Sequence, residues 1–223
     1  MFEGKYSKLL TILLIIGIIV IVGVIGFLAF NFINNYYINK DAKDEVERFE
    51  GEVNNNTSNT TQNEMLNDVA PTIGIENIIS NTNNSSDSNQ RMYKGFPMVG
   101  TIQIPAINLE YPVLEVASKS AIEVAVAVYD GPGLNQSGNT TIVGHNYRNG
   151  TFFSDNKKLA EGDKIYITDN AGTKIEYIIY KTITTSPEDS SYLDRDTAGK
   201  REISLLTCTD DTKSRLVIFA KEK

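Results

Sequence analysis

The chain of 223 residues contains one cysteine, Cys208, and one histidine, His145. Each follows an apolar, β-prone run, residues 202–207 for the cysteine and residues 140–144 for the histidine, and each precedes a polar loop. A thiol attacks carbonyl carbons as the thiolate, and a nearby imidazole can promote that form and later protonate a leaving amine. Either residue alone is more often structural. Their shared position at strand ends predicts an acyl-transfer site, provided that the sheet closes and brings them together.

Arg215 begins the β-prone run that follows Cys208 across a short polar turn. In an antiparallel hairpin this position returns close to the end of the partner strand, so the guanidinium can lie near the thiol. Its fixed charge and forked donors suit a developing oxyanion or a backbone carbonyl of a substrate. The spacing alone favours a different role, a salt bridge to Asp210 or Asp211 in the same turn.

The segment that carries these residues, 98–223, is predicted to be an all-β catalytic domain. Short β-branched and aromatic runs alternate there with turn residues, which is typical of a sandwich or barrel. Closure would remove exposed sheet edges, so we expect an eight-stranded closed β-barrel. Short helical turns are expected at Ser118–Val124 and Phe152–Leu159. The expected strands are Val99–Ile104, Leu109–Val116, Ala125–Tyr129, Thr140–His145, Lys164–Asp169, Lys174–Thr185, Glu202–Cys208 and Arg215–Lys221.

The N-terminal part of the chain has a different composition. Residues 9–33 are almost entirely apolar, and this run exceeds both the roughly 20 residues of a membrane-spanning helix and the about 7–15 of a cleaved signal peptide. We therefore expect a transmembrane signal anchor. Lys5 and Lys8 place residues 1–8 in the cytoplasm and the rest of the chain outside. Residues 34–97 are rich in Asn, Ser and Thr and are expected to form a flexible extracellular linker, because they offer little apolar surface to bury. Within this linker, Asp44–Phe49 is a candidate for a short helical stem.

Charge and cysteine content exclude several classes of partner. The formal net charge is −7, and the sequence lacks the clustered basic face that binding to phosphate backbones requires, so we expect no nucleic-acid partner. A single cysteine cannot form an intramolecular disulfide or a thiolate metal cluster. We expect no cofactor.

Four motifs resemble those of the sortases, the membrane-anchored cysteine transpeptidases of Gram-positive bacteria. The resemblance covers about Val99 to Lys221, nearly the whole predicted barrel. Around its cysteine the family has Thr-Leu-x-Thr-Cys, and Ser204 here replaces the first threonine but keeps a hydroxyl. The four motifs are Gly-Thr-Ile-Gln-Ile-Pro at 100–105, Val-Gly-His-Asn at 143–146, Ser-Leu-Leu-Thr-Cys at 204–208 and Arg-Leu-Val at 215–217.

The resemblance implies a sortase-type β-barrel and a specific reaction. Cys208 would be the nucleophile that forms a thioester, and His145 the general acid and base. Arg215 would stabilise the oxyanion or position the sorting signal, and Thr207 would line the substrate groove. The substrates would be secreted proteins with a C-terminal sorting signal, often Leu-Pro-x-Thr-Gly-like and cut between Thr and Gly. The acceptor would be an amine of the peptidoglycan precursor, met at the outer face of the cell membrane.

The subclass of sortase stays open. The sequence lacks the Asp-Pro-aromatic lid motif and the second, C-terminal span of pilin-polymerising sortases, so that type is not expected. Some class A sortases bind calcium, and the acidic candidates here are Glu161, Asp163 and Glu188. Scattered carboxylates are normally solvated surface, so we predict no required metal.

Two alternatives remain. A cell-wall cysteine peptidase would hydrolyse the same acyl-enzyme, although papain-like peptidases place Cys before His in the chain, the opposite of the order here. A non-catalytic, membrane-tethered β-domain would bury Cys208 as a small apolar side chain.

Overall fold

The computed structural model describes the backbone of residues 3–64 and 90–223. The chain divides into two compact units, Met1–Lys40 and Asp41–Lys223. One long helix, α1 (Glu3–Glu64), supplies the first unit and the first described segment of the second.

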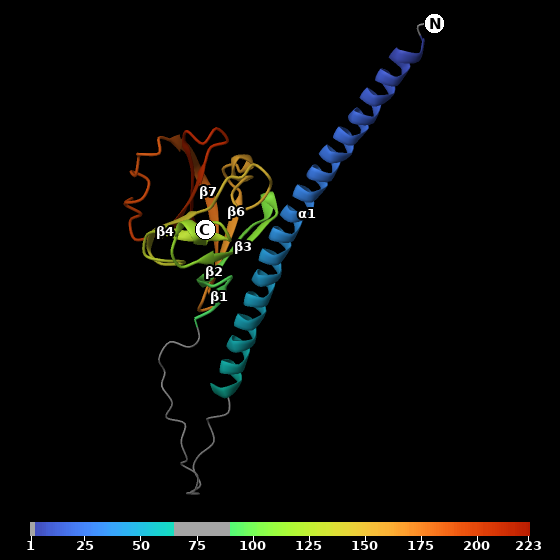
Figure 1. Ribbon diagram of the computed structural model, residues 1–223. Coiled ribbons are helices and arrows are strands. Elements are labelled where there is room, and N and C mark those ends of the chain that lie inside the picture. The colour runs from blue at the N-terminus through green and yellow to red at the C-terminus, as the bar shows by residue number, and fades with distance from the viewer. Residues whose placement is uncertain (1–2, 65–89) are drawn as a thin grey trace, which may run out of the picture. The chain divides into compact units, whose positions relative to one another are not determined.

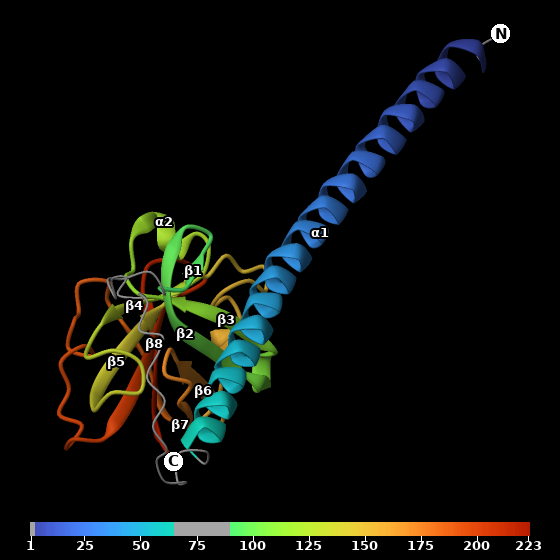
Figure 2. The same cartoon turned by 90° about the horizontal axis from the view of Figure 1, so that it is seen from below.

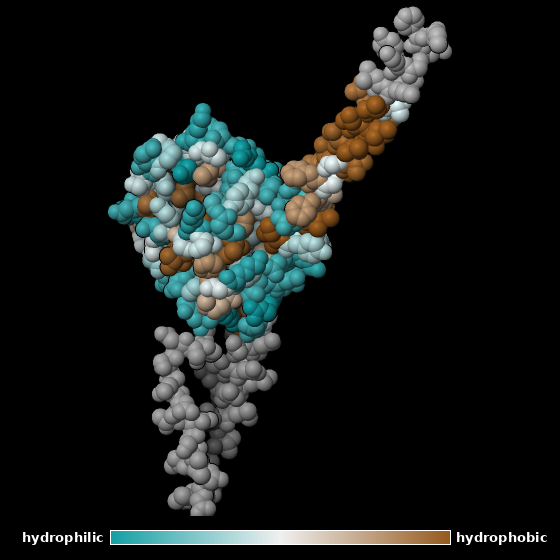
Figure 3. All heavy atoms as spheres, in the orientation of Figure 1, coloured by the Kyte–Doolittle hydropathy of each residue, from teal (hydrophilic) through white to brown (hydrophobic). Residues whose placement is uncertain are grey.

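The first unit has the length and composition of a membrane-spanning helix. From Leu10 onward α1 is apolar enough to cross a bilayer, and none of the residues in its most apolar stretch is buried. Figure 3 shows these apolar side chains in brown along the helix. The core helix of a soluble protein would bury such side chains. The helix therefore fits the anchor expected at residues 9–33, while its sidedness stays a prediction.

Eight strands of the second unit close into a barrel (Figures 1 and 2). Their order is β2-β3-β4-β5-β8-β9-β7-β6, and β6 pairs again with β2 to complete the ring. The β3–β4 and β5–β8 pairs are parallel and the others antiparallel. A two-residue strand, β1 (Met92–Tyr93), is added to β2. The barrel strands are β2 (Phe96–Ile104), β3 (Leu109–Leu114), β4 (Val126–Asp130), β5 (Gly138–Val143), β6 (Lys164–Asp169), β7 (Lys174–Thr185), β8 (Arg201–Cys208) and β9 (Arg215–Glu222).

The eight-stranded barrel expected from the sequence is confirmed. Strands β6 and β7 begin and end at the expected residues, and the other strands differ by a few residues. Side chains alternate between the two faces of a strand, so every second residue enters the barrel core. Ile102 and Ile104 on β2 and Ile165 and Ile167 on β6 are all fully buried in this way.

The short helical turns form where the sequence predicts them. Helix α2 (Lys119–Ile122) begins after Ser118, whose Oγ accepts a hydrogen bond from the backbone N–H of Ala121 at 3.1 Å. Ser118 thus acts as an N-cap residue, because it binds a backbone N–H of the first turn that has no partner within the helix. A 3₁₀ turn, η2 (Asn156–Lys158), lies within the second expected turn, and another, η1 (Pro105–Ile107), joins β2 to β3.

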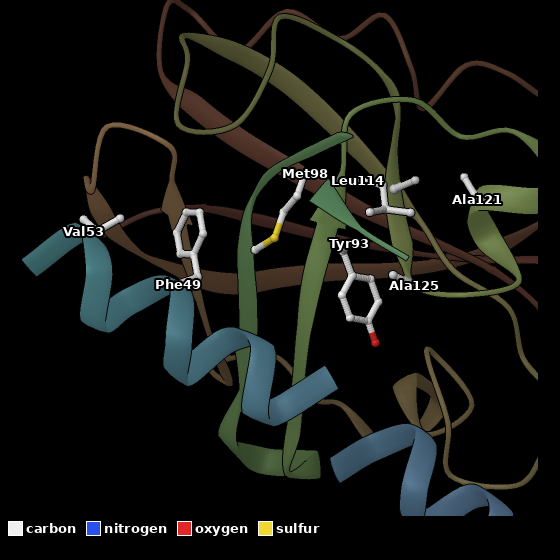
Figure 4. Packing of buried hydrophobic residues seen from close by; sticks show 8 residues of the cluster. Phe49, Val53, Tyr93, Met98, Leu114, Ala121 and Ala125 are labelled. Atoms are coloured by element: carbon white, nitrogen blue, oxygen red, sulfur yellow. The ribbon is translucent and has the colours of Figure 1, made fainter. Parts of the chain in front are cut away.

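Part of the flexible linker expected over residues 34–97 is helical, and this helix is longer than the short stem considered at Asp44–Phe49. Helix α1 continues to Glu64, and its face at Ala42, Val46, Phe49 and Val53 is buried. Figure 4 shows Phe49 and Val53 facing the barrel domain. These spacings repeat every three to four residues, so one stripe of a polar helix supplies the apolar contact. The remainder of the expected linker, residues 65–89, lies outside the described residues.

We call the docked segment Asp41–Val53 the stem. Phe49 and Val53 join one buried cluster with Tyr93, Met98 and Leu114 of the domain. The ion pairs around the stem, such as Lys94 with Asp41 at 2.7 Å, are solvent-exposed. Exposed pairs contribute about 0–1 kcal/mol each, whereas a buried phenylalanine contributes several times more. Burial of apolar side chains therefore dominates the attachment of the stem.

Candidate active site

The strand registers bring the three predicted reactive residues together at one end of the barrel. In the parallel β5–β8 pair Val143 lies opposite Leu206. His145 and Cys208 each follow two residues later, so the same register places His145 beside Cys208. In the antiparallel β8–β9 pair Cys208 lies opposite Arg215. Neighbouring strands are about 4.8 Å apart. The three residues thus occupy one row, although β5 ends at Val143 and His145 belongs to the loop after it.

Hydrogen bonds hold the backbone on both sides of His145 against β8. The hydroxyl of Thr207 donates to the carbonyl oxygen of Gly144 at 2.7 Å. The side-chain amide of Asn146 donates through Nδ2 to the carbonyl oxygen of Cys208 at 2.9 Å. The residues before and after the histidine are therefore tied to the cysteine and its neighbour, so that the position of the imidazole follows from the sheet.

Gly144, the residue before His145, is required by packing. A Cβ at this position would lie 2.8 Å from Cγ1 of Val126 and 2.9 Å from Cδ2 of Phe153. Real Cβ atoms essentially never approach so closely. The glycine of the Val-Gly-His-Asn motif therefore lets the chain pass between β4 and the loop that follows His145.

Arg215 contacts the thiol directly. Its Nη1 lies 3.3 Å from Sγ of Cys208, within hydrogen-bonding distance for sulfur. The salt bridge to the acidic turn that spacing alone favours does not form among the described residues. Asp210 instead pairs with Lys157 at 2.5 Å, and Asp211 accepts a hydrogen bond from the hydroxyl of Thr209.

His145 has two further neighbours, Tyr147 and Glu123. The imidazole stacks on the Tyr147 ring with centroids 4.8 Å apart, and its Nε2 lies 3.5 Å from Oε1 of Glu123. The phenol of Tyr147 donates to Oε2 of Glu123 at 2.5 Å. Burial and this carboxylate raise the pKa of Tyr147 to about 12, so the phenol stays protonated near neutral pH. No sequence motif pointed to Glu123, which lies at the C-terminal end of α2.

Thr207 does not line an open groove, which corrects the role expected for it. Its side chain is 2% exposed and its hydroxyl is bonded to Gly144. Because side chains alternate along β8, Thr207 points to the face opposite Cys208. Its observed contact is with the backbone before His145.

The face that Cys208 and Arg215 share carries a buried apolar cluster that the sequence did not single out. Leu206, Val217 and Phe219 lie on this face, and Tyr192 from the β7–β8 connection packs against them. Beside this cluster is a hollow of about 260 Å³. The hollow is lined by Tyr180, Lys181, Ile183, Ser191, Tyr192, Arg195 and Phe219.

The acidic residues named as calcium candidates do not gather into a metal-binding group. No cluster of three or more His, Cys, Asp or Glu side chains suited to a metal is found within the described part of the chain. Asp163 accepts a hydrogen bond from the backbone N–H of Ala160 at 2.8 Å, as a turn-capping carboxylate does.

Comparison with known proteins identifies the family. A family model described as the Sortase domain matches residues 102–223, more than half of the chain, and this segment contains His145, Cys208 and Arg215. The chain belongs to the sortase family. It is similar to Sortase A of Bacillus anthracis, with 32% identity over 124 residues that cover 54% of this chain and 58% of that protein. It thus spans less than two thirds of this curated relative.

Solved sortase structures share the fold. Sortase A from Corynebacterium diphtheriae matches with a TM-score of 0.53 and 28% identity, over 57% of this chain and 61% of that one. A Sortase D5 transpeptidase from Clostridium perfringens matches with a TM-score of 0.52 and 26% identity, over 57% and 79% respectively. Both similarities are of the same order, so they support the family without resolving the subclass.

Proposed function

We propose that this protein is a cysteine transpeptidase. It cleaves a C-terminal sorting signal of the Leu-Pro-x-Thr-Gly kind in secreted proteins and transfers the acyl part to an amine of the peptidoglycan precursor. The observation that carries this proposal is the row of His145, Cys208 and Arg215, in which Nη1 of the arginine lies 3.3 Å from the sulfur. A thiol, an imidazole and a fixed cation are the groups that acyl transfer requires.

In the first half-reaction the thiolate of Cys208 attacks the carbonyl carbon of the scissile threonine. Arg215 donates hydrogen bonds to the oxyanion that develops. The imidazolium of His145 gives its proton to the departing glycine amine as the C–N bond breaks. The products are a free glycine-bearing peptide and a thioester on the enzyme.

The second half-reaction reverses these roles. An incoming amine attacks the thioester carbon, neutral His145 takes the proton, and the C–S bond breaks to restore the thiolate of Cys208. One amide bond replaces another, so the reaction needs neither a cofactor nor a redox partner. If water replaces the amine the outcome is hydrolysis, so the relative access of amine and water decides between transpeptidase and peptidase.

The proposed site of action is the outer face of the cell membrane. Lys5 and Lys8 precede the apolar helix, and the excess of lysine on the cytoplasmic side orients such spans. The secreted substrate and the lipid-linked precursor would both be present at that face. A single N-terminal anchor would therefore hold the barrel where its two substrates meet.

Site variants of the full-length chain in detergent micelles test the proposal with a sorting-signal peptide. Cys208→Ala should abolish cleavage, and His145→Ala should be nearly as severe. Arg215→Ala should lower kcat by roughly 10²–10³, the usual effect of removing one oxyanion donor. Lys213→Ala is the matched control, because it removes an exposed cation from the turn before Arg215.

The control is expected to retain wild-type turnover, and all four variants should keep the circular dichroism spectrum of the wild type. Cleavage by Cys208→Ala would refute the mechanism.

Added calcium is expected to leave turnover unchanged, and a gain in rate that a chelator reverses would contradict the prediction that no metal is required.

A further inference from the structure

The carboxylate of Glu123 faces the ring nitrogen of His145 that points away from bulk solvent. Nε2 is a buried atom with no hydrogen-bond partner among the described residues, and Oε1 of Glu123 lies 3.5 Å from it. A buried polar nitrogen is costly unless it is paired. The carboxylate is the acceptor within reach of an Nε2–H.

Tyr147 fixes both members of this pair. Its hydroxyl donates to Oε2 of Glu123 at 2.5 Å, and its ring stacks on the imidazole with an interplanar angle of 28°. The tyrosine is held in turn by its backbone N–H, which donates to Oγ of Ser154 at 3.1 Å, and by edge contact with the ring of Phe152. One side chain therefore limits the movement of both the acid and the imidazole.

Glu123 reaches the site from an element of its own. It is the C-cap residue of α2, and its side chain is 52% exposed, against 28% for the side chain of His145. The ionisable groups elsewhere around the histidine are Cys208 and Arg215 in the same row, with Arg148 and Asp210 in the loops beyond it. Glu123 is the group whose carboxylate lies against the ring, with Oε1 3.5 Å from Nε2.

We propose that Glu123 is a positioning residue for His145, with Tyr147 as its clamp. By accepting a hydrogen bond from Nε2–H, the carboxylate holds the neutral imidazole in one tautomer and leaves Nδ1 as the nitrogen that exchanges a proton during acyl transfer. This inference rests on the proposed function, because it gives His145 its acid–base role. Glu123 itself touches neither the sulfur nor the substrate.

Nitrogen-15 NMR tests the tautomer directly. The chain has a single histidine, so a full-length protein with ¹⁵N-labelled histidine in micelles gives one pair of ring signals. At a pH where the imidazole is neutral, the wild type should show the Nε2–H tautomer. Glu123→Ala should shift the signals toward a tautomer mixture, and Glu123→Gln should largely restore the wild-type pattern because its amide oxygen can still accept.

Steady-state kinetics supply the second readout. Glu123→Ala should lower kcat by roughly 10- to 100-fold, the usual cost of losing a residue that orients an active group, with KM little changed. Glu123→Gln should recover most of that loss, and Tyr147→Phe, which keeps the stacking but loses the hydroxyl, should be intermediate. Lys119→Ala, an exposed change on the same short helix, should behave as the wild type.

The two readouts separate this inference from the function on which it rests. A wild-type signal of the Nδ1–H tautomer, or a Glu123→Ala protein with unchanged tautomer and unchanged kcat, would overturn the positioning role. A protein that shows the expected tautomer changes but never cleaves a sorting peptide would overturn the transpeptidase function and leave the positioning role intact.

Discussion

Phe49→Ala is expected to release the stem from the barrel domain. Phe49 lies on the stem, the polar part of α1, is 1% exposed, and packs into the cluster with Tyr93, Met98 and Leu114. The guanidinium of Arg91 also lies 4.4 Å from the centre of its ring. Truncation to alanine would remove the largest buried side chain that the stem contributes.

The size of the effect follows from the burial. Truncating a buried phenylalanine costs about 3–5 kcal/mol. Alanine is the better helix former by about 0.5 kcal/mol, which offsets a small part of that cost. A net loss of about 3 kcal/mol in docking free energy corresponds to roughly a hundredfold larger population of the undocked stem. A polar helix segment that is no longer docked is only marginally stable in water. Its backbone amides would then open and exchange their hydrogens with solvent.

Hydrogen exchange with mass spectrometry on the full-length chain measures this change. Peptides from residues 42–53 should exchange roughly a hundredfold faster in Phe49→Ala, while a peptide from the core strand β8 should change less. Asp44→Ala is the matched control, because Asp44 is exposed on the same helix and its replacement also introduces alanine, with its high helix propensity. Equal exchange of the stem in the two variants would refute the argument that Phe49 docks it.

Two other predictions concern the surroundings of the site. Gly144→Ala should destabilise the domain by about 1–3 kcal/mol through overpacking against Val126 and Phe153, measured by urea denaturation, and an unchanged midpoint would contradict this. Hydrogen bonds from Lys157 and a neighbouring amide lower the pKa of Asp210 below 3.8, so the pair stabilises the fold at neutral pH and loses that effect as the pH falls through the lowered pKa. Lys157→Met should raise the pKa of this carboxyl toward 3.8 in a carbon-13 NMR titration, and an unmoved midpoint would show that the pair does not form.

The barrel was predictable because its strands carry a local signal. Alternating apolar residues and the turns between them set the bounds of β6 and β7, which the structure reproduces. The proximity of His145 and Cys208 was a weaker prediction, since it depends on the parallel pairing of β5 with β8, which no short segment encodes. Whether the guanidinium of Arg215 turns to the thiol or to the acidic turn is likewise decided only by the folded sheet.

The sequence reasoning indicated the stem only in part, as a short helix at Asp44–Phe49, and did not indicate Glu123 at all. The stem is polar in composition, and its buried residues are visible only as a helical stripe from Ala42 to Val53 within an Asn-rich region. The mean composition of the region does not reveal such a stripe, whereas the spacing of its apolar residues at three to four positions does. Glu123 approaches His145 through a tertiary contact between α2 and the loop after β5, so no spacing along the chain connects the two.

The central claim is that Cys208 carries the acyl group between the two half-reactions. Intact-protein mass spectrometry of the full-length chain, incubated with a sorting-signal peptide and then with an amine acceptor, tests it most directly. The expected result is a mass increase equal to the N-terminal part of the peptide, located on Cys208, which disappears when the amine is added and is replaced by the peptide–amine product. Cleavage without any adduct, or an adduct that water resolves while the amine is never incorporated, would contradict the claim.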